Sequence, residues 1–198
     1  MTPLQTYPFN MIRDTRGAAV VEFALAVPTL LIIFAGLFDL AHNMYAQSVL
    51  QGSMHEASRY ATIENADRDA LDNQVLETVK AVAPGAKITF TRKAYSQFGD
   101  MSRPEDFTDS NGDGICNNGE SFEDANRNGT YDEDRGVVGG GGSRDAILYT
   151  ATMRYERAFP VAGLLGFSDD YTGTASTVLR NQPYDNTEIP VPPVGSCT

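Results

Sequence analysis

The feature that most restricts the fold of this chain is a long apolar run near its amino terminus. From Gly17 to Phe38 the sequence carries one charged residue, Glu22. The run is 22 residues long, and about 20 apolar residues are enough to cross the hydrocarbon core of a bilayer as a helix. We therefore predict a transmembrane helix here, rather than a segment of a water-soluble core.

The charges that flank this run predict its orientation. Arg13 and Arg16 precede it and Asp39 follows it. Because the cytoplasmic side of membrane helices is enriched in Lys and Arg, we expect the amino terminus in the cytoplasm and the rest of the chain outside. A cleaved secretory signal is the alternative, but its apolar region normally spans about 7 to 15 residues and ends in a small-residue cut site. The A-x-A pattern of this run, at residues 24–26, lies too early for such a cut.

Glu22 needs an explanation because a carboxylate inside an apolar helix is costly. The cost is about 2 to 3 kcal/mol at the centre of a membrane helix and less near its end, so such a residue is by default functional and has a partner. The competing interpretation is that Glu22 lies at headgroup depth beside Arg16. Composition alone favours this second interpretation.

The segment RGAAVVEFALAVPTLL, together with the later EASRYA, resembles the amino terminus of the TadE-like proteins. These are minor pseudopilins of the tight-adherence (Tad, type IVc) pilus system. The resemblance extends from about Arg13 to Ala61. It implies that Gly17 ends a leader removed by a prepilin peptidase, that Ala18 becomes the first residue, and that Glu22 is the family's glutamate, followed by the aromatic Phe23.

The chemistry of such a cut explains the glutamate. Cleavage after Gly17 would leave Ala18 with an α-amino group of pKa about 8, which is mostly cationic at neutral pH. In a helix, Ala18 and Glu22 lie one turn apart on the same face, and in a bundle the amine can equally pair with Glu22 of a neighbouring chain. Either pairing gives the intramembrane carboxylate a counter-ion.

The resemblance also implies a place and a role. It predicts a single-pass protein of the bacterial inner membrane that takes part in the assembly or initiation of a Tad adhesion pilus. Its partners would be the membrane, the other Tad pilus subunits and the assembly machinery. The carboxyl-terminal domain would be periplasmic or extracellular, and the chain could enter the pilus itself.

The rest of the sequence predicts an α+β domain. Helical spacing continues to Ile63, and a second helix is expected over residues 67–82. Alternating runs that begin at Lys87, Ala146 and Tyr171 predict strands of a small antiparallel sheet packed on the helix. We thus expect a leader at 1–17, a membrane helix with its extension at 18–63, and a pilin-like domain at 64–198.

The negative charge of the chain is concentrated in one segment. The formal net charge is −11, and the stretch from Glu105 to Arg135 holds ten acidic and two basic residues. A cation is the natural partner of such a segment, whereas a nucleic acid would require a Lys/Arg surface. We therefore expect an acidic insertion at 105–136, followed by a flexible Gly-rich linker at 139–143.

Within the insertion, DSNGDGICNNGE matches the calcium-loop template D-x-[DN]-x-[DN]-G-x5-E in full. Calcium prefers oxygen ligands, and the template supplies them from side chains and one backbone carbonyl around a sharp glycine turn. The predicted ligands are Asp109, Asn111, Asp113, the carbonyl of Ile115, Asn117 and Glu120. The sequence therefore predicts one calcium ion in this first loop.

A partial repeat, DANRNGTYDEDR, follows directly. Its twelfth place holds Arg135 instead of a carboxylate, and Asp132 or Asp134 is a candidate substitute. The predicted second-loop ligands are Asp124, Asn126, Asn128, Thr130, Asp132 and Asp134. Only 15 residues separate the two loop starts, so the pair resembles compact extracellular calcium loops rather than helix-flanked EF-hands. A second ion remains open, and the alternative for the whole segment is a disordered acidic insertion.

The two cysteines, Cys116 and Cys197, are candidates for a disulfide if this domain lies outside the cytoplasm. Such a bond would tie the first loop to the carboxyl-terminal tail. Two unpaired thiols fit the sequence equally well.

Nothing in the sequence indicates catalysis or a small-molecule substrate. G-x-S-x-G, P-loop and zinc-protease patterns are absent. His42 and His55 stand apart on a predicted helix and are interpreted as solvated residues. The alternative to a pilus subunit is therefore another non-enzymatic protein, an uncleaved membrane-anchored module that binds or adheres in the presence of calcium.

Overall fold

The structure is a computed structural model that describes residues 17–61, 67–142, 145–159, 161–164, 166, 168–180 and 191–198. The predicted leader, apart from Gly17, and Ser143 of the predicted linker lie outside the described residues. The chain forms two compact units. The amino-terminal unit comprises Met1–His42 and Arg157–Asp169, and the α+β unit comprises Asn43–Glu156 and Asp170–Thr198.

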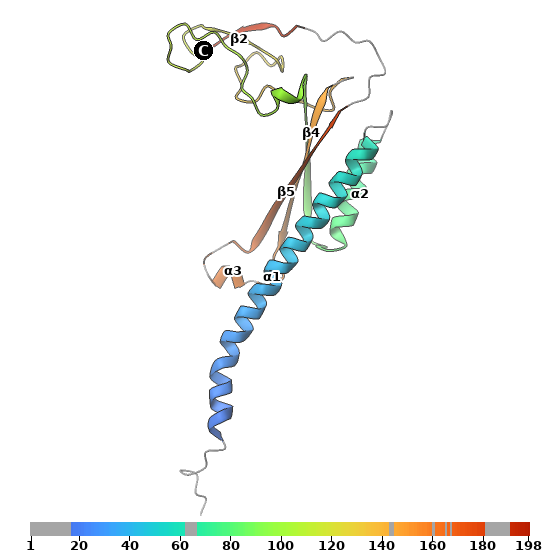
Figure 1. Ribbon diagram of the computed structural model, residues 1–198, viewed down its shortest axis with the longest axis vertical. Coiled ribbons are helices and arrows are strands. Elements are labelled where there is room, and N and C mark those ends of the chain that lie inside the picture. The colour runs from blue at the N-terminus through green and yellow to red at the C-terminus, as the bar shows by residue number, and fades with distance from the viewer. Residues whose placement is uncertain are drawn as a thin grey trace, which may run out of the picture. The chain divides into compact units, whose positions relative to one another are not determined.

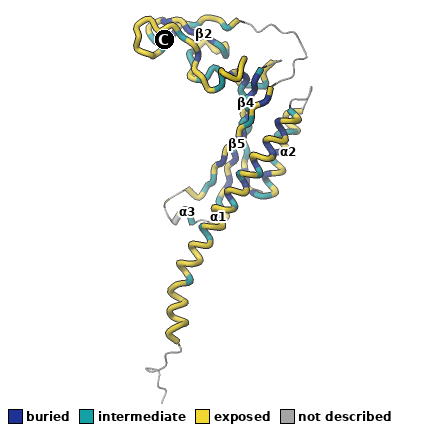
Figure 2. The backbone as a smooth tube through the Cα atoms, viewed as in Figure 1, coloured by how far each residue is buried: buried dark blue, intermediate teal, exposed yellow. Residues whose placement is uncertain are grey.

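The helix α1 runs without interruption from Ala18 to Ala61 and begins in the amino-terminal unit (Figure 1). The long apolar helix predicted from the sequence is thereby confirmed. Its first half is exposed almost throughout, with Leu25 74% exposed (Figure 2). It is long and apolar enough to cross a membrane. Exposing so many apolar side chains to water is unfavourable, so a bilayer is the environment that suits this half of α1.

The α+β unit contains a four-stranded antiparallel sheet with the order β3-β1-β4-β5. The strands are β1 (Lys87–Tyr95), β3 (Val137–Val138), β4 (Ala146–Glu156) and β5 (Asp170–Arg180). The three long strands lie where the alternating sequence predicted them, and the predicted antiparallel sheet is confirmed. The two-residue strand β3 was not predicted, because so short a segment shows no alternation.

The core lies on one face of this sheet. Along β4, Tyr149, Ala151 and Met153 are buried, whereas the residues between them are more exposed, as expected for a strand with one covered face. Helices α1 and α2 (Arg68–Lys80) supply the other half of the core. Their buried side chains are Ala46, Leu50, Met54, Ala57, Val75 and Val79.

Helix α2 begins one residue later and ends two residues earlier than the sequence predicted. The side chain of Asp67 caps it by accepting hydrogen bonds from the backbone N–H groups of Asp69 and Ala70, both at 3.1 Å. At the other end, the N–H of Val82 donates to the carbonyl of Val79 at 3.0 Å, which tightens the last turn. The helix therefore gives way to a turn before residue 82.

A cluster of three side chains fastens α2 to the sheet. Both guanidinium nitrogens of Arg92 donate to the carboxylate of Asp72 on α2, and the hydroxyl of Tyr149 donates to the same carboxylate. The Arg92 guanidinium also lies 4.3 Å from the centre of the Tyr149 ring. Burial and the neighbouring Asp72 carboxylate raise the pKa of Tyr149 above its usual range, so the hydroxyl keeps its proton at neutral pH.

We expect Asp72→Ala to lower the free energy of unfolding by about 2 to 3 kcal/mol. The substitution leaves the partly buried Arg92 guanidinium and the Tyr149 hydroxyl without their shared acceptor. The measurement is thermal unfolding of the full chain in detergent, followed by circular dichroism. Glu77→Ala is the matched control, because Glu77 lies on the same helix with a 75% exposed side chain and should change stability by at most about 0.5 kcal/mol. Equal effects of the two substitutions would contradict the assignment.

The acidic insertion has a small core of its own. The ring of Tyr131 contacts those of Phe107 and Phe122 edge to face, with centroid distances of 5.4 and 5.9 Å. Strand β2 (Ser121–Glu123) pairs with β6 (Val194–Ser196) near the carboxyl terminus. A Cβ on Gly195 would lie 2.3 Å from the Phe122 ring, so this position of β6 accommodates only glycine.

Candidate functional site

The residues implied in processing lie at the start of α1. Gly17 directly precedes the helix, and Ala18 is its first residue. Ala18, Glu22 and Phe23 are all exposed, Phe23 to 69%. The helical geometry places Glu22 one turn after Ala18 on the same face, which is the spacing that an ion pair with a new α-amino group requires.

The first predicted calcium loop is tightly wound around its first aspartate. Asp109 accepts hydrogen bonds from the backbone N–H groups of Gly112 at 2.6 Å and Gly114 at 2.9 Å. Both glycines have positive φ, 77° and 76°, which residues with a side chain adopt at a cost. These two glycines therefore allow the chain to turn around Asp109.

Three of the template side chains converge inside this loop. The amide groups of Asn111 and Asn117 donate to the same carboxylate oxygen of Asp113, at 3.0 and 2.8 Å. The hydrogen bond from Asn117 is the main cause that lowers the pKa of Asp113 below its usual value. Asp113 is therefore ionised at neutral pH. The side-chain NH2 groups of Asn111 and Asn117 both face its negative charge, which a bound cation would neutralise.

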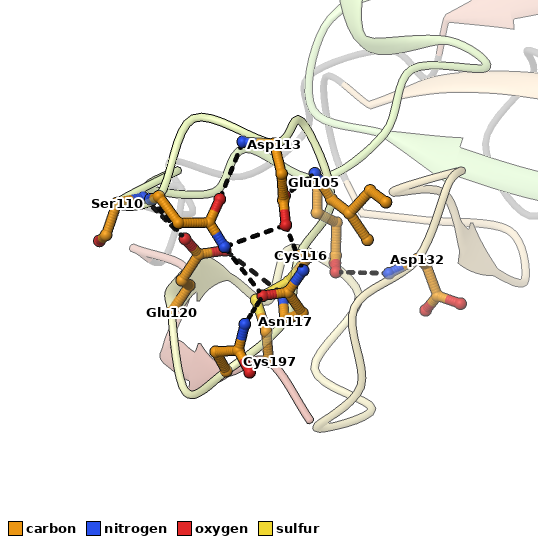
Figure 3. Close-up of a disulfide and its surroundings, with 11 residues drawn as sticks. Glu105, Ser110, Asp113, Cys116, Asn117, Glu120, Asp132 and Cys197 are labelled. Carbon is orange, nitrogen blue, oxygen red and sulfur yellow. Dashed lines mark hydrogen bonds between the residues drawn. A yellow bond between two sulfur atoms is a disulfide. The ribbon is translucent and has the colours of Figure 1, made fainter.

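The glutamate at the twelfth place closes the loop. Glu120 is only 7% exposed. One of its carboxylate oxygens accepts from the N–H groups of Ser110 at 2.7 Å and Asn111 at 3.4 Å, and the other accepts from the N–H of Asn117 at 3.3 Å (Figure 3). Glu120 thus accepts hydrogen bonds from the backbone N–H groups at the second, third and ninth positions of the loop.

The second loop repeats this geometry. Asp124 accepts from the backbone N–H groups of Asn128 at 3.0 Å and Gly129 at 2.8 Å, and the fourth and sixth positions, Arg127 and Gly129, again have positive φ of 61° and 81°. The amides of Asn126 and Asn128 both donate to one oxygen of Asp132, at 2.7 and 2.5 Å. The third, fifth and ninth positions therefore converge as they do in the first loop.

The carboxylate that closes the second loop is Glu105, which sequence reasoning missed. It is 1% exposed. One oxygen accepts from the N–H groups of Ala125 at 2.8 Å and Asn126 at 3.4 Å, and the other accepts from the N–H of Asp132 at 3.1 Å. These are again the second, third and ninth positions. Because Glu105 precedes the first loop in the sequence, no local spacing connects it with the second.

Arg135, at the twelfth place of the second loop, holds the segment that carries Glu105. Its side chain donates to the carbonyl of Pro104 at 2.7 Å from Nη2 and 3.1 Å from Nε. The backbone N–H of Glu105 donates to the carbonyl of Asp132 at 3.0 Å. An arginine therefore stands at the position of the template carboxylate because the carboxylate comes from another part of the chain.

Asp134, which we considered as a substitute ligand, is engaged elsewhere. Its carboxylate accepts from the Lys93 ammonium at 2.6 Å and from the Tyr95 hydroxyl at 3.0 Å, both on β1. Burial and the hydrogen bond to Asp134 raise the pKa of Tyr95 to about 12. Asp134 thus joins the insertion to the sheet, and the structure directs its carboxylate away from the ligand role.

The donor chemistry of both loops fits a hard cation such as calcium, because all donors are oxygen atoms. No group of three or more His, Cys, Asp or Glu side chains is gathered as a metal site in the described residues. The template supplies three carboxylates, Asp109, Asp113 and Glu120, together with asparagine and backbone oxygens, and the structure does not gather these three carboxylates as a metal site. The carboxylate oxygens of Glu120 and Glu105 accept hydrogen bonds from backbone N–H groups of the loops. A bound ion would have to replace these N–H groups as the partner of the oxygens.

A disulfide joins Cys116, at the eighth place of the first loop, to Cys197 (Figure 3). The two Cα atoms are 5.3 Å apart. The N–H of Cys197 donates to the carbonyl of Glu120 at 2.7 Å, and the N–H of Gly119 donates to the carbonyl of Cys197 at 3.0 Å. The carboxyl-terminal tail is therefore fixed along the part of the loop that carries Glu120.

Comparison with known proteins bears on the amino-terminal segment. The model of the TadE-like protein family matches residues 17–59. No curated protein and no solved structure matches the chain. The matched range contains Gly17, Ala18, Glu22 and Phe23 and lies almost entirely on α1, whereas the sheet and both loops fall outside it. Over residues 17–59 the chain is therefore similar to the TadE-like family, and the resemblance carried by its amino-terminal motif is confirmed.

Proposed function

We propose that the chain is a minor pilin or pseudopilin that takes part in the assembly or initiation of a Tad-type adhesion pilus. The observation that carries the proposal is the TadE-like match, which coincides with the exposed apolar helix. In the membrane this surface contacts lipid, and in a filament it packs against the helices of other subunits. Such a role is structural and needs no catalytic site.

The proposal includes removal of the leader after Gly17 by a prepilin peptidase. The new amine of Ala18 then pairs with Glu22, within one chain or between neighbours. This gives the exposed carboxylate a partner at the depth where an unpaired charge is costly. The protein reaches this state from the inner membrane, with its amino terminus in the cytoplasm and the α+β unit outside.

Calcium has a structural role in this proposal. The first loop binds one ion through Asp109, Asn111, Asp113, the Ile115 carbonyl, Asn117 and Glu120. The third, fifth and ninth positions of the second loop converge as they do in the first loop, which supports a second ion, with Glu105 in the role of Glu120. Extracellular calcium modules bind with dissociation constants of about 10⁻⁴ to 10⁻³ M. Binding would reduce the net negative charge of the acidic insertion and stabilise it.

The second candidate is an uncleaved membrane anchor that carries a calcium-dependent binding or adhesion module. The position of the family match supports the first candidate, whereas the position of both loops outside that match leaves room for the second. The state of the amino terminus separates the two, because an anchor keeps residues 1–17 and a pilin loses them.

The test is the intact mass of the protein from the inner membrane and from the sheared surface fraction of its native host. We expect a species that begins at Ala18 in the sheared fraction. Glu22→Ala should still insert and be processed, but its amount in the sheared fraction should fall strongly, because the pairing that orders the helices is lost. Glu56→Ala is the control, because it removes an exposed carboxylate from the later part of α1. Its amount in the sheared fraction should equal that of the unaltered chain.

A full-length species confined to the membrane would refute the pilin and support the anchored module. Normal release of Glu22→Ala would refute the role given to that carboxylate.

A further inference from the structure

The loop between β4 and β5 carries a second apolar stretch, AFPVAGLLGF, at residues 158–167. Arg157 precedes the stretch, and Asp169 and Asp170 follow shortly after it. The structure describes residues 158, 159, 161–164 and 166 of this loop, including the short helix α3 (Val161–Leu164). Phe159 is 41% exposed. A loop of this composition is unusual in contact with water alone, because ten successive residues carry no charged side chain.

This loop belongs to the same compact unit as the amino-terminal half of α1. Cγ1 of Val161 lies 4.0 Å from the position that a Cβ would take on Gly36. At the base of the loop, Nη1 of Arg157 lies 2.5 Å from Oδ2 of Asp39, and the N–H of Arg157 donates to the carbonyl of Asp169 at 2.8 Å. An ion pair therefore joins the base of the loop to α1, and Val161 lies close to Gly36 of the same helix.

These contacts set the depth of the loop relative to the uncharged run of α1. That run ends at Phe38, and Asp39 is the first charge after it. A helix rises about 1.5 Å per residue, so Gly36 lies about 3 Å inside the end of the run. Val161 therefore lies beside the run, whereas Arg157 lies at its border.

The ion pair at the base of the loop fits the same border. The side chains of Asp39 and Arg157 are only 8% and 22% exposed, and they neutralise each other. Pairing reduces the cost of placing both charges beside hydrocarbon.

We propose that the β4–β5 loop inserts into the outer leaflet of the same bilayer that α1 crosses, with Phe159 and α3 in contact with lipid acyl chains. The inference rests on the proposed membrane span of α1. Because the loop lies beside the outer end of that span, the lipid that surrounds the span would also contact the loop. The loop then acts as a second membrane contact on the outer side, next to the end of the span.

The experiment places a nitroxide label at one position at a time in the full chain, reconstituted into phosphatidylethanolamine and phosphatidylglycerol vesicles. Both native cysteines form the disulfide, so Ala162→Cys provides the only free thiol. Collisions with oxygen report lipid, and collisions with a water-soluble nickel complex report water. We expect the label at 162 to collide several-fold less often with nickel, and more often with oxygen, than a label in water. Phe159→Cys is a second position in the loop and should behave in the same way.

Two further labels make the result specific. Val138→Cys, at an 84% exposed aliphatic residue of the α+β unit, should report water, and Ile32→Cys, at a 49% exposed residue of the run, should report lipid. Water at 159 and 162 with lipid at 32 would overturn the inference and leave the membrane span intact. Water at 32 would refute the span itself. Spin–spin broadening at 162 that disappears on dilution with unlabelled chain would show that a second copy covers the loop, which would also overturn the inference.

Discussion

Loss of the Cys116–Cys197 disulfide is expected to lower the free energy of unfolding of the α+β unit by about 4 to 5 kcal/mol. The bond closes a loop with a sequence separation of 81 residues, and in the chain-entropy model a loop of this length removes that much conformational freedom from the unfolded chain. For a domain of this size the loss corresponds to a decrease in Tm of roughly 10 to 18 °C. This is the largest effect that we expect from any single bond in the protein.

The change should be concentrated in the insertion. Cys197 lies next to β6, which pairs with β2, and its backbone bonds both Gly119 and Glu120. Once the disulfide is broken, no covalent bond holds the short tail to the first loop, and backbone hydrogen bonds remain. We therefore expect the first loop and the β2–β6 pair to exchange their amide hydrogens faster, while the sheet of β1, β4 and β5 keeps its protection.

The measurement is thermal unfolding of the Cys116→Ser/Cys197→Ser variant and of the unaltered chain in detergent, followed by circular dichroism. Reductant should lower the Tm of the unaltered chain to that of the variant and leave the variant unchanged. A variant with the same Tm as the unaltered chain would mean that the disulfide to the tail contributes nothing to the stability of this unit.

Calcium is expected to raise the Tm of the unaltered chain by roughly 5 to 11 °C. For a dissociation constant near 10⁻⁴ M, 10 mM calcium is about 100 times that constant and stabilises the folded state by about 2.7 kcal/mol for one ion. The reason is that the loop carboxylates are held in place by their own backbone amides only in the folded chain. An unfolded chain has no such arrangement and binds the ion weakly.

The triple substitution Asp109→Asn, Glu120→Gln and Glu105→Gln should abolish this response. Each replacement keeps the size of the side chain and an oxygen that accepts from the loop amides, while it removes the negative charge that attracts the ion. Glu105→Gln alone should remove only the part of the response that belongs to the second loop. Calorimetric titration should then find one ion fewer than in the unaltered chain.

Glu77→Gln is the charge-matched control, and its calcium response should equal that of the unaltered chain. Magnesium should reproduce little of the effect, because it requires a smaller, octahedral site. A triple variant that still gains the full increase in Tm would refute the assignment of calcium to these loops.

The strands show how far local sequence reaches. Lys87, Ala146 and Tyr171 were predicted as strand starts, and the observed starts agree to within one residue, because alternating burial leaves a period of two in the sequence. Strands β2, β3 and β6 have three, two and three residues, which is too few to show a period. Their existence depends on partners that the chain supplies from a distance.

The two calcium-type loops also differ in how far the sequence predicted their geometry. The order of the oxygen-bearing side chains in the first loop could be read from the sequence because Asp109 and Glu120 belong to one continuous template. In the second loop the sequence offered Asp132 or Asp134 for the missing carboxylate. The structure instead brings Glu105 to the equivalent amides and pairs Asp134 with Lys93.

By itself, the sequence determined the long apolar helix, its TadE-like segment and the three long strands, because each depends on residues that are neighbours along the chain. Only the tertiary structure decided that Glu105 closes the second loop, that Cys197 reaches Cys116, and that the β4–β5 loop lies against α1 at Gly36 and Asp39. These contacts join residues far apart in the sequence, so they follow from the path of the folded chain and leave no periodic signal by which the sequence could predict them.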